Sequence, residues 1–172
     1  MNGAKINLTN ATEVLINQKI NLKLLRYGCP AFISTLKRLG GSRDFAEEQF
    51  RSLGRKIGFY VGQRWDKKYK NIKDLVKDTF KSFGSKKFEI KSSKDKFIIM
   101  DRDCMLCWHL IDTSDVPFCV IISGYVEGFL ESFSKKTSLI YPKATTQTIQ
   151  SRSTGDDICK HEVRFATNNG GL

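Results

Sequence analysis

The first half of the chain carries apolar residues at the spacing of helices. Between residues 20 and 39 they recur at steps of three and four, which predicts one helix that Pro30 either kinks or restarts. Asp44 followed by Glu47 has the pattern of a capping box, so a second helix is predicted from there to about Tyr69. Its inward side should carry Phe50, Leu53, Ile57, Val61 and Trp65.

A third helix precedes a change of period. This helix is predicted over residues 71–83, with Asn71 as its cap and Gly84 as its terminator. Over residues 88–100, apolar and polar positions alternate around a Ser-Ser-Lys-Asp turn, which predicts a β-hairpin. The nearly continuous apolar run at residues 104–111 is predicted as a buried strand, with a helical turn as the alternative.

The remaining pattern completes an α+β architecture. Helical spacing returns over residues 117–133, and two strands are predicted at 139–149 and 158–165. The order of helices, hairpin, helix and hairpin favours an antiparallel sheet with helices packed on it. The expected division of the chain has three parts: a polar N-terminal segment (1–19), one domain (20–166) and a flexible tail (167–172).

Composition narrows the location of the protein. At 172 residues with 40% hydrophobic content, the chain can bury one core. No apolar run approaches the roughly 18 residues of a membrane span, and the start MNGAKINLTN does not resemble an export signal. Five cysteines cannot all pair within one chain, which favours a reducing compartment. We therefore expect a cytoplasmic protein, able to lie at the periphery of membranes.

Positive charge is concentrated in one stretch. The net charge is +11, and residues 64–96 hold twelve Lys/Arg against five Asp/Glu. This excess could dock an acidic protein or an anionic membrane, and the alternative is a lysine-rich surface that is merely solvated. The predicted basic surface consists of Lys67, Lys68, Lys70, Lys73, Lys77 and Lys81.

Glycines recur at steps of four in two of the predicted helices. Each glycine inside a helix costs about 1 kcal/mol relative to alanine, so another interaction should offset this cost. The stripe allows either tight helix packing or the close approach of a ligand such as an acyl chain. The candidate apolar tunnel is lined by Gly58, Gly62, Trp65, Gly124 and Gly128.

The cysteines form a weak metal motif. Cys104 and Cys107 have the CxxC spacing, and Cys119 and Cys159 could in principle contribute further thiols. The motif lies in an apolar run rather than in the tight turn of a zinc knuckle, and buried cysteines commonly act as small hydrophobic residues. We therefore expect no metal, with Cys104, Cys107 and Cys159 as the alternative ligand set.

Two other function classes lack their signatures. The sequence has neither a local thiol–histidine signature for nucleophilic catalysis nor a phosphate-binding loop, so we expect no enzyme. Nucleic-acid binding is not expected either, because Phe80 and Phe83 fall on the core side of their helix rather than forming a stacking platform.

Three segments resemble the small core subunits of TRAPP, which share their fold with the 4-vinyl-reductase domain. The segments read LLRYG at residues 24–28, GFYVGQRW at 58–65 and ISGYVEGFL at 122–130. The resemblance covers about residues 20–166. It implies a four-stranded antiparallel sheet with helices on it, and a non-catalytic scaffold for vesicle tethering and small-GTPase activation.

The resemblance also implies partners. Homodimers or heterodimers with related subunits should form through the first two helices, and a small GTPase or an anionic membrane is a further expected partner. The predicted interface consists of Leu25, Cys29, Phe32, Leu36 and Phe50.

Two ligands known in the wider family meet departures in this chain. In some TRAPP subunits an acyl chain on a cysteine after the second helix fills a tunnel, but residues 65–71 here contain no cysteine, so at most a free fatty acid or lipid is expected. Metal-binding members of the vinyl-reductase branch have a cysteine eight residues before the final one, whereas Ser151 precedes Cys159 here. The alternative function is a lipid-, hydrocarbon- or zinc-sensing domain of that branch.

Overall fold

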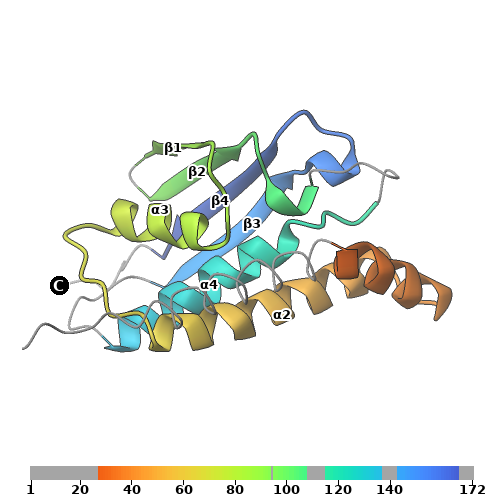
Figure 1. Cartoon of the computed structure of the whole chain (residues 1–172), viewed down its shortest axis with the longest axis horizontal. Helices are drawn as coiled ribbons and strands as arrows, with labels where there is room; N and C mark the ends of the chain where they lie inside the picture. The colour runs from red at the N-terminus through yellow and green to blue at the C-terminus, as the bar shows by residue number, and fades with distance from the viewer. Residues whose placement is uncertain (1–26, 94, 108–114, 137–142, 167–172) are drawn as a thin grey trace, which may run out of the picture.

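A computed structural model describes residues 27–93, 95–107, 115–136 and 143–166 of the chain. Within these ranges, helices pack on one face of a four-stranded antiparallel sheet of order β1-β2-β4-β3, and Figure 1 shows α4 lying between the sheet and α2. The labelled elements are α2 (Arg43–Gln63), α3 (Ile72–Ser82), β1 (Phe88–Ser92), β2 (Lys96–Asp101), η1 (Met105–Cys107), α4 (Val120–Lys136), β3 (Ala144–Gln150), η2 (Arg152–Thr154) and β4 (Cys159–Phe165). The predicted fold class is confirmed.

The first helix and the start of α2 refine the sequence predictions. Residues 27–38 are helical, Pro30 included, while residues 20–26 of the predicted helix lie outside the described ranges. Helix α2 is capped by Ser42, whose Oγ accepts a hydrogen bond from Phe45 N, so the predicted cap at Asp44 was wrong. Asp44 instead occupies the first turn, where its charge favours the positive end of the helix dipole.

Helix α2 ends at Gln63 rather than near Tyr69. Its last turn is tighter than an α-helical turn, because Arg64 N donates a hydrogen bond to Val61 O, only three residues earlier. After this turn the chain runs back towards α4. The buried Tyr69 ring meets Phe133 edge-on with ring centroids 5.7 Å apart, and its hydroxyl accepts a hydrogen bond from Trp65 Nε1. Burial of Tyr69 therefore requires a loop where the apolar spacing alone predicted more helix.

Helix α3 agrees with its prediction at both ends. Asn71 Oδ1 accepts a 2.9 Å hydrogen bond from Asp74 N at the start, and Gly84 adopts the left-handed backbone (φ 96°) that terminates a helix. The helix packs its apolar side on the sheet, where Phe80 contacts Phe88 and His161.

The sheet consists of two hairpins paired through β2 and β4. Both predicted hairpins are confirmed, although residues 139–142 of the third predicted strand lie outside the described ranges. The strand predicted at residues 104–111 was wrong over its described part, because η1 is a turn of 3-10 helix. No helix in the described ranges is long and apolar enough to cross a membrane.

Candidate functional sites

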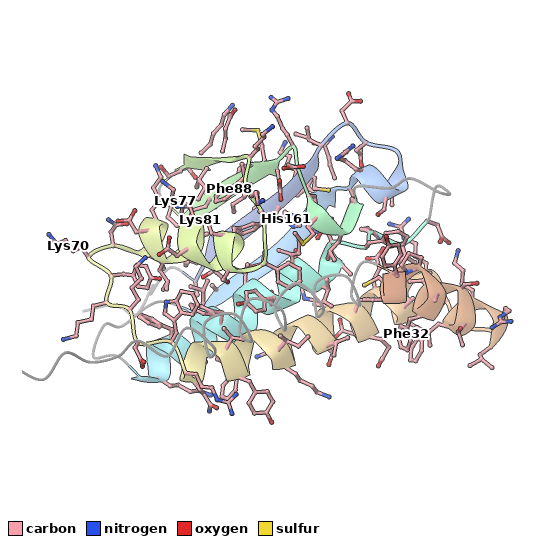
Figure 2. All side chains as sticks on the ribbon, viewed as in Figure 1. Phe32, Lys70, Lys77, Lys81, Phe88 and His161 are labelled. Carbon is pink, nitrogen blue, oxygen red and sulfur yellow. The ribbon has the colours of Figure 1, made fainter. Side chains whose placement is uncertain are left out.

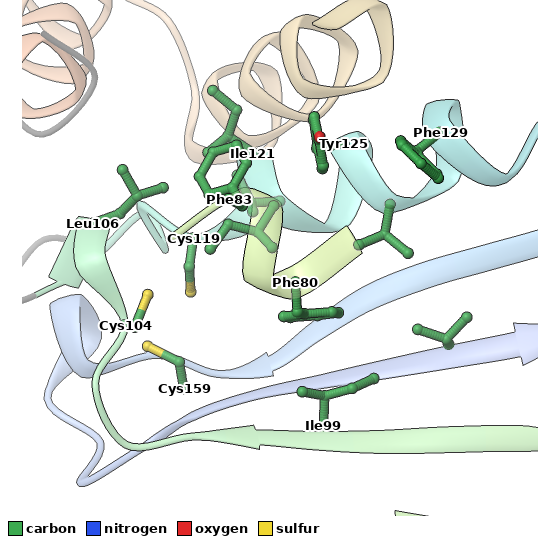
Figure 3. Close-up of a cluster of buried hydrophobic side chains, with 14 of the residues drawn as sticks. Phe80, Phe83, Ile99, Cys104, Leu106, Cys119, Ile121, Tyr125, Phe129 and Cys159 are labelled. Atoms are coloured by element: carbon green, nitrogen blue, oxygen red, sulfur yellow. The ribbon is translucent and has the colours of Figure 1, made fainter. Parts of the chain in front are cut away.

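Four cysteines from separate parts of the sequence meet at one end of the sheet. Cys104 and Cys107 follow β2, Cys119 precedes α4, and Cys159 begins β4. Their Sγ atoms all lie within 4.8 Å of one another, and every one of the four residues is buried. Figure 3 shows the thiols of Cys104, Cys119 and Cys159 pointing towards one another. We call these four residues the thiol cluster.

The 3-10 turn η1 is what brings the CxxC pair together. Cys107 N donates a 3.1 Å hydrogen bond to Cys104 O, which closes the turn. Side chains three residues apart eclipse one another in a 3-10 helix, whereas in a strand they point to opposite faces. The sequence argument against a metal was that the CxxC pair lies in an apolar run rather than in a tight turn, and the observed 3-10 turn removes that part of the argument.

Hydrogen-bonding groups border the thiol cluster. Ser151 Oγ lies 3.2 Å from Cys119 Sγ and 3.5 Å from Cys107 Sγ, and Arg152 N donates to Cys159 Sγ at 3.4 Å. Ser151 is the position where the vinyl-reductase resemblance called for a cysteine. In this chain the hydroxyl contacts the cluster and the CxxC pair contributes two thiols.

Hydrogen bonds among the clustered thiols, together with burial, shift their pKa values in opposite directions. Bonds from Cys104, Cys119 and Cys159 lower the pKa of the Cys107 thiol. The pKa of Cys104 is raised, chiefly by its hydrogen bond to Cys107, and burial raises that of Cys119. Four sulfur donors meet at this point, and thiolate sulfur is the ligand that soft metal ions prefer.

Cys29 and His161 are not members of the thiol cluster. Cys29, on the first helix, has its pKa raised to about 12 by burial and by the charge of the neighbouring Cys107. His161 is buried beside Phe80, and its Nδ1 lies 3.2 Å from Ser123 Oγ. His109 lies outside the described residues. The predicted ligand set of Cys104, Cys107 and Cys159 omitted Cys119, which the structure places in the cluster.

The predicted dimer interface is only partly at the surface. Phe32 is 46% exposed and Leu36 is half-buried, but Cys29 and Phe50 are buried within the chain, and Leu25 lies outside the described residues. Phe50 is covered by Phe32 itself, with the two rings edge-to-face at 5.4 Å. Cys29 and Phe50 therefore support the first two helices from inside rather than contacting a partner.

A different set of apolar residues is exposed on the same two helices and in the turn that joins them. Phe45, Leu53 and Tyr60 are eight and seven residues apart, which places them along one side of α2. Sequence reasoning had assigned Leu53 to the core, because periodicity cannot tell a core from a partner. We call the whole set the apolar helix surface; it consists of Tyr27, Phe32, Leu39, Phe45, Leu53 and Tyr60, between 42% and 79% exposed.

The glycine stripe is a helix-packing contact between α2 and α4. A Cβ built on Gly58 would lie 2.0 Å from Tyr125 O, and one on Gly124 would lie 1.9 Å from Arg51 O. Gly62 and Gly128 meet the opposite helix in the same way, and Trp65 contacts the Phe129 ring at 5.3 Å. The sequence left two alternatives for these glycines, tight helix packing or an apolar tunnel. The structure shows tight packing, because backbone atoms of the opposite helix occupy the space beside the glycines.

All six lysines of the predicted basic surface lie within the described residues. All six lysines are exposed, and Lys73, Lys77 and Lys81 follow one another at steps of four along α3. Lys67 pairs with Asp78. Figure 2 shows Lys70, Lys77 and Lys81 at α3, far from Phe32 at the other end of the molecule.

Comparisons with known proteins identify the fold. No protein-family model and no curated protein sequence matches the chain. A trafficking protein particle complex subunit 3 from Naegleria fowleri, covalently bound to palmitic acid, has a similar structure with a TM-score of 0.68 and 16% identity, covering 87% of this chain and 97% of that one.

Two further solved structures share the fold. A vinyl-4-reductase family protein from Methanocaldococcus jannaschii gives a TM-score of 0.52 at 19% identity, covering 97% of this chain and 99% of that one. The phenol-responsive sensory domain of the transcription activator PoxR gives a TM-score of 0.51 at 13% identity, and the match covers 85% of this chain and 77% of that one. The chain thus has the fold of TRAPP small subunits and vinyl-4-reductase domains.

Proposed function

We propose that the protein is a non-catalytic scaffold subunit of the TRAPP kind, which pairs with a second copy of itself through the apolar helix surface. The observation that carries this proposal is the exposure of six large apolar side chains, five on two consecutive helices and Leu39 in the turn between them. Exposed apolar residues gathered in this way mark protein contacts, because water solvates them poorly.

The dimensions of the first two helices suit a stable interface. Helix α2 has 21 residues and is therefore about 30 Å long, and helix 27–38 extends the surface beyond its start. A standard interface buries about 800 Å² on each partner. Aromatic side chains such as Phe32, Phe45 and Tyr60 are the type that contributes most binding energy at interfaces.

The basic surface suits a different partner. Lys73, Lys77 and Lys81 are exposed along α3, whereas Leu75 and Phe80 of the same helix are buried. We propose that this surface attracts an anionic membrane, which would place the paired scaffold at the periphery of vesicles in the cytoplasm. A role in tethering and in small-GTPase activation rests on the shared fold with a trafficking-complex subunit.

The pairing proposal is tested by charge substitutions at the apolar helix surface. Leu53→Glu and Phe45→Glu should convert the paired chain into a monomer in size-exclusion chromatography with light scattering, because a carboxylate would be buried without a partner. Ile149→Glu is the matched control, since Ile149 is 46% exposed but lies on β3. Equal masses for wild type and both α2 variants would contradict the proposal.

The alternative of a lipid- or hydrocarbon-sensing domain has less support. The glycines predicted to line a tunnel contact helix backbone instead, and the aromatic rings of Trp65, Phe129 and Phe133 pack against one another and Tyr69. The zinc-sensing form of the alternative keeps one specific observation in its favour, the thiol cluster.

A further inference from the structure

We propose that Cys104, Cys107, Cys119 and Cys159 bind one Zn²⁺ ion in a closed tetrahedral site. This inference goes beyond the proposed scaffold function and does not depend on pairing. It rests on the convergence of four buried thiols from three separate segments of the chain onto one point.

The spacing of the sulfur atoms fits one metal ion. A Zn–S bond of about 2.3 Å in a tetrahedron places the sulfurs about 3.8 Å apart, and the four Sγ atoms lie within 4.8 Å of one another. All four thiols are free, and a disulfide would need two sulfurs at about 2.05 Å. A cluster of several irons with bridging sulfides would need a wider ring of thiolates than this.

The surroundings supply what a buried thiolate site needs. Zinc with four thiolates carries two net negative charges, so hydrogen bonds to sulfur must help to stabilise it. Arg152 N already donates to Cys159 Sγ. Ser151 Oγ accepts from the Cys119 thiol and lies 3.5 Å from Cys107 Sγ, so its own hydroxyl proton could turn to one of these sulfurs once they are thiolates. Ligands enter as thiolates, so each thiol that is still protonated releases its proton to solvent as its S–Zn bond forms.

Four protein ligands leave no open position for water or substrate, so the ion would act on stability rather than on chemistry. It would join the end of β2, the turn η1, the start of α4 and the start of β4. Leu106, between the CxxC pair, is only 3% exposed, so the same turn is also held by the core.

The first test uses the wild-type chain purified under reducing conditions without added metal. Elemental analysis should find about one zinc per chain, and refolding with Co²⁺ alone should give the intense thiolate-to-cobalt charge-transfer bands and visible bands of a tetrahedral four-sulfur site. A chain free of zinc that also gives no such spectrum with Co²⁺ would overturn the proposal, and iron in place of zinc would overturn the assignment of the ion.

The second test compares three of the four proposed ligands with the remaining cysteine. Cys104→Ser, Cys107→Ser and Cys119→Ser should each lose most of the bound zinc, whereas Cys29→Ser, which replaces a buried cysteine outside the cluster, should keep it. If a ligand variant does not fold, X-ray absorption of the wild-type zinc decides: four sulfur neighbours support the site, and nitrogen or oxygen neighbours contradict it. Equal zinc loss from Cys29→Ser would also contradict it.

Discussion

Gly58 of α2 and Tyr125 of α4 are in backbone contact: a Cβ on Gly58 would lie 2.0 Å from the Tyr125 carbonyl oxygen. The contact is reciprocated, because a Cβ on Gly128 of α4 would lie 1.9 Å from Arg55 O of α2. The side of α2 that contacts α4 is thus fixed by glycines, and this packing orients the apolar helix surface towards solvent.

Gly58→Ala should strongly destabilise the protein. The added methyl group would meet backbone atoms, which cannot move without separating the two helices, so we expect a loss of about 3 kcal/mol or more in the free energy of unfolding. Gly28→Ala is the matched control, because nothing lies within 4 Å of its Cβ position in helix 27–38. It should be neutral or stabilising by up to about 1 kcal/mol. Urea denaturation measures both, and similar stabilities for the two variants would contradict the packing.

Stability should fall as the solution is acidified from about pH 6.5 to pH 4. Burial lowers the pKa of His161 from 6.5 to about 4, and its Nε2 has no hydrogen-bond partner among the described residues. In this pH interval the unfolded chain binds a proton at His161 that the folded chain excludes. The free energy of unfolding of the wild type should therefore fall by about 3 kcal/mol.

His161→Phe isolates this contribution, because Ser123 and Thr148 can still hydrogen-bond to each other at 2.8 Å. Urea denaturation at pH 7 and at pH 4 should show that the free energy of unfolding falls less for the variant than for wild type. Equal losses in both proteins would mean that His161 does not titrate as its burial requires.

Removing three lysines from α3 should weaken binding to anionic vesicles. Each lysine near a phosphatidylserine-rich surface contributes about 1 kcal/mol, so Lys73→Gln, Lys77→Gln and Lys81→Gln together should lower the affinity about 100-fold. Sedimentation with vesicles measures binding, and phosphatidylcholine vesicles and high salt serve as controls. If the triple variant bound the vesicles as tightly as wild type, the three lysines would not take part in membrane binding and would be merely solvated.

Local signals in the sequence predicted the elements that local interactions decide. Asn71 and Gly84 mark the ends of α3 by their own hydrogen bonding and backbone conformation, and the structure has both as expected. The cap of α2 was displaced by two residues, because Ser42 and Asp44 are both good caps and only the loop geometry selects between them. The end of α2 was missed because the burial of Tyr69 against Phe133 is a tertiary contact.

The candidate sites depended more on long-range contacts. The thiol cluster brings together residues as far apart in the sequence as 104 and 159, and the local spacing of residue types cannot predict such a long-range contact. The interface prediction chose Cys29 and Phe50 because apolar periodicity gives one stripe for the core and for a partner alike. A signal was available for α2: its glycine stripe marks the packed side, so Phe45 and Tyr60, on another side, could have been assigned to the surface.

The most direct test of the proposed function is the mass of the wild-type chain as a function of concentration. Sedimentation equilibrium across the micromolar range should give the mass of two chains, falling towards that of one chain only on dilution. A single-chain mass at every concentration would contradict pairing through the apolar helix surface.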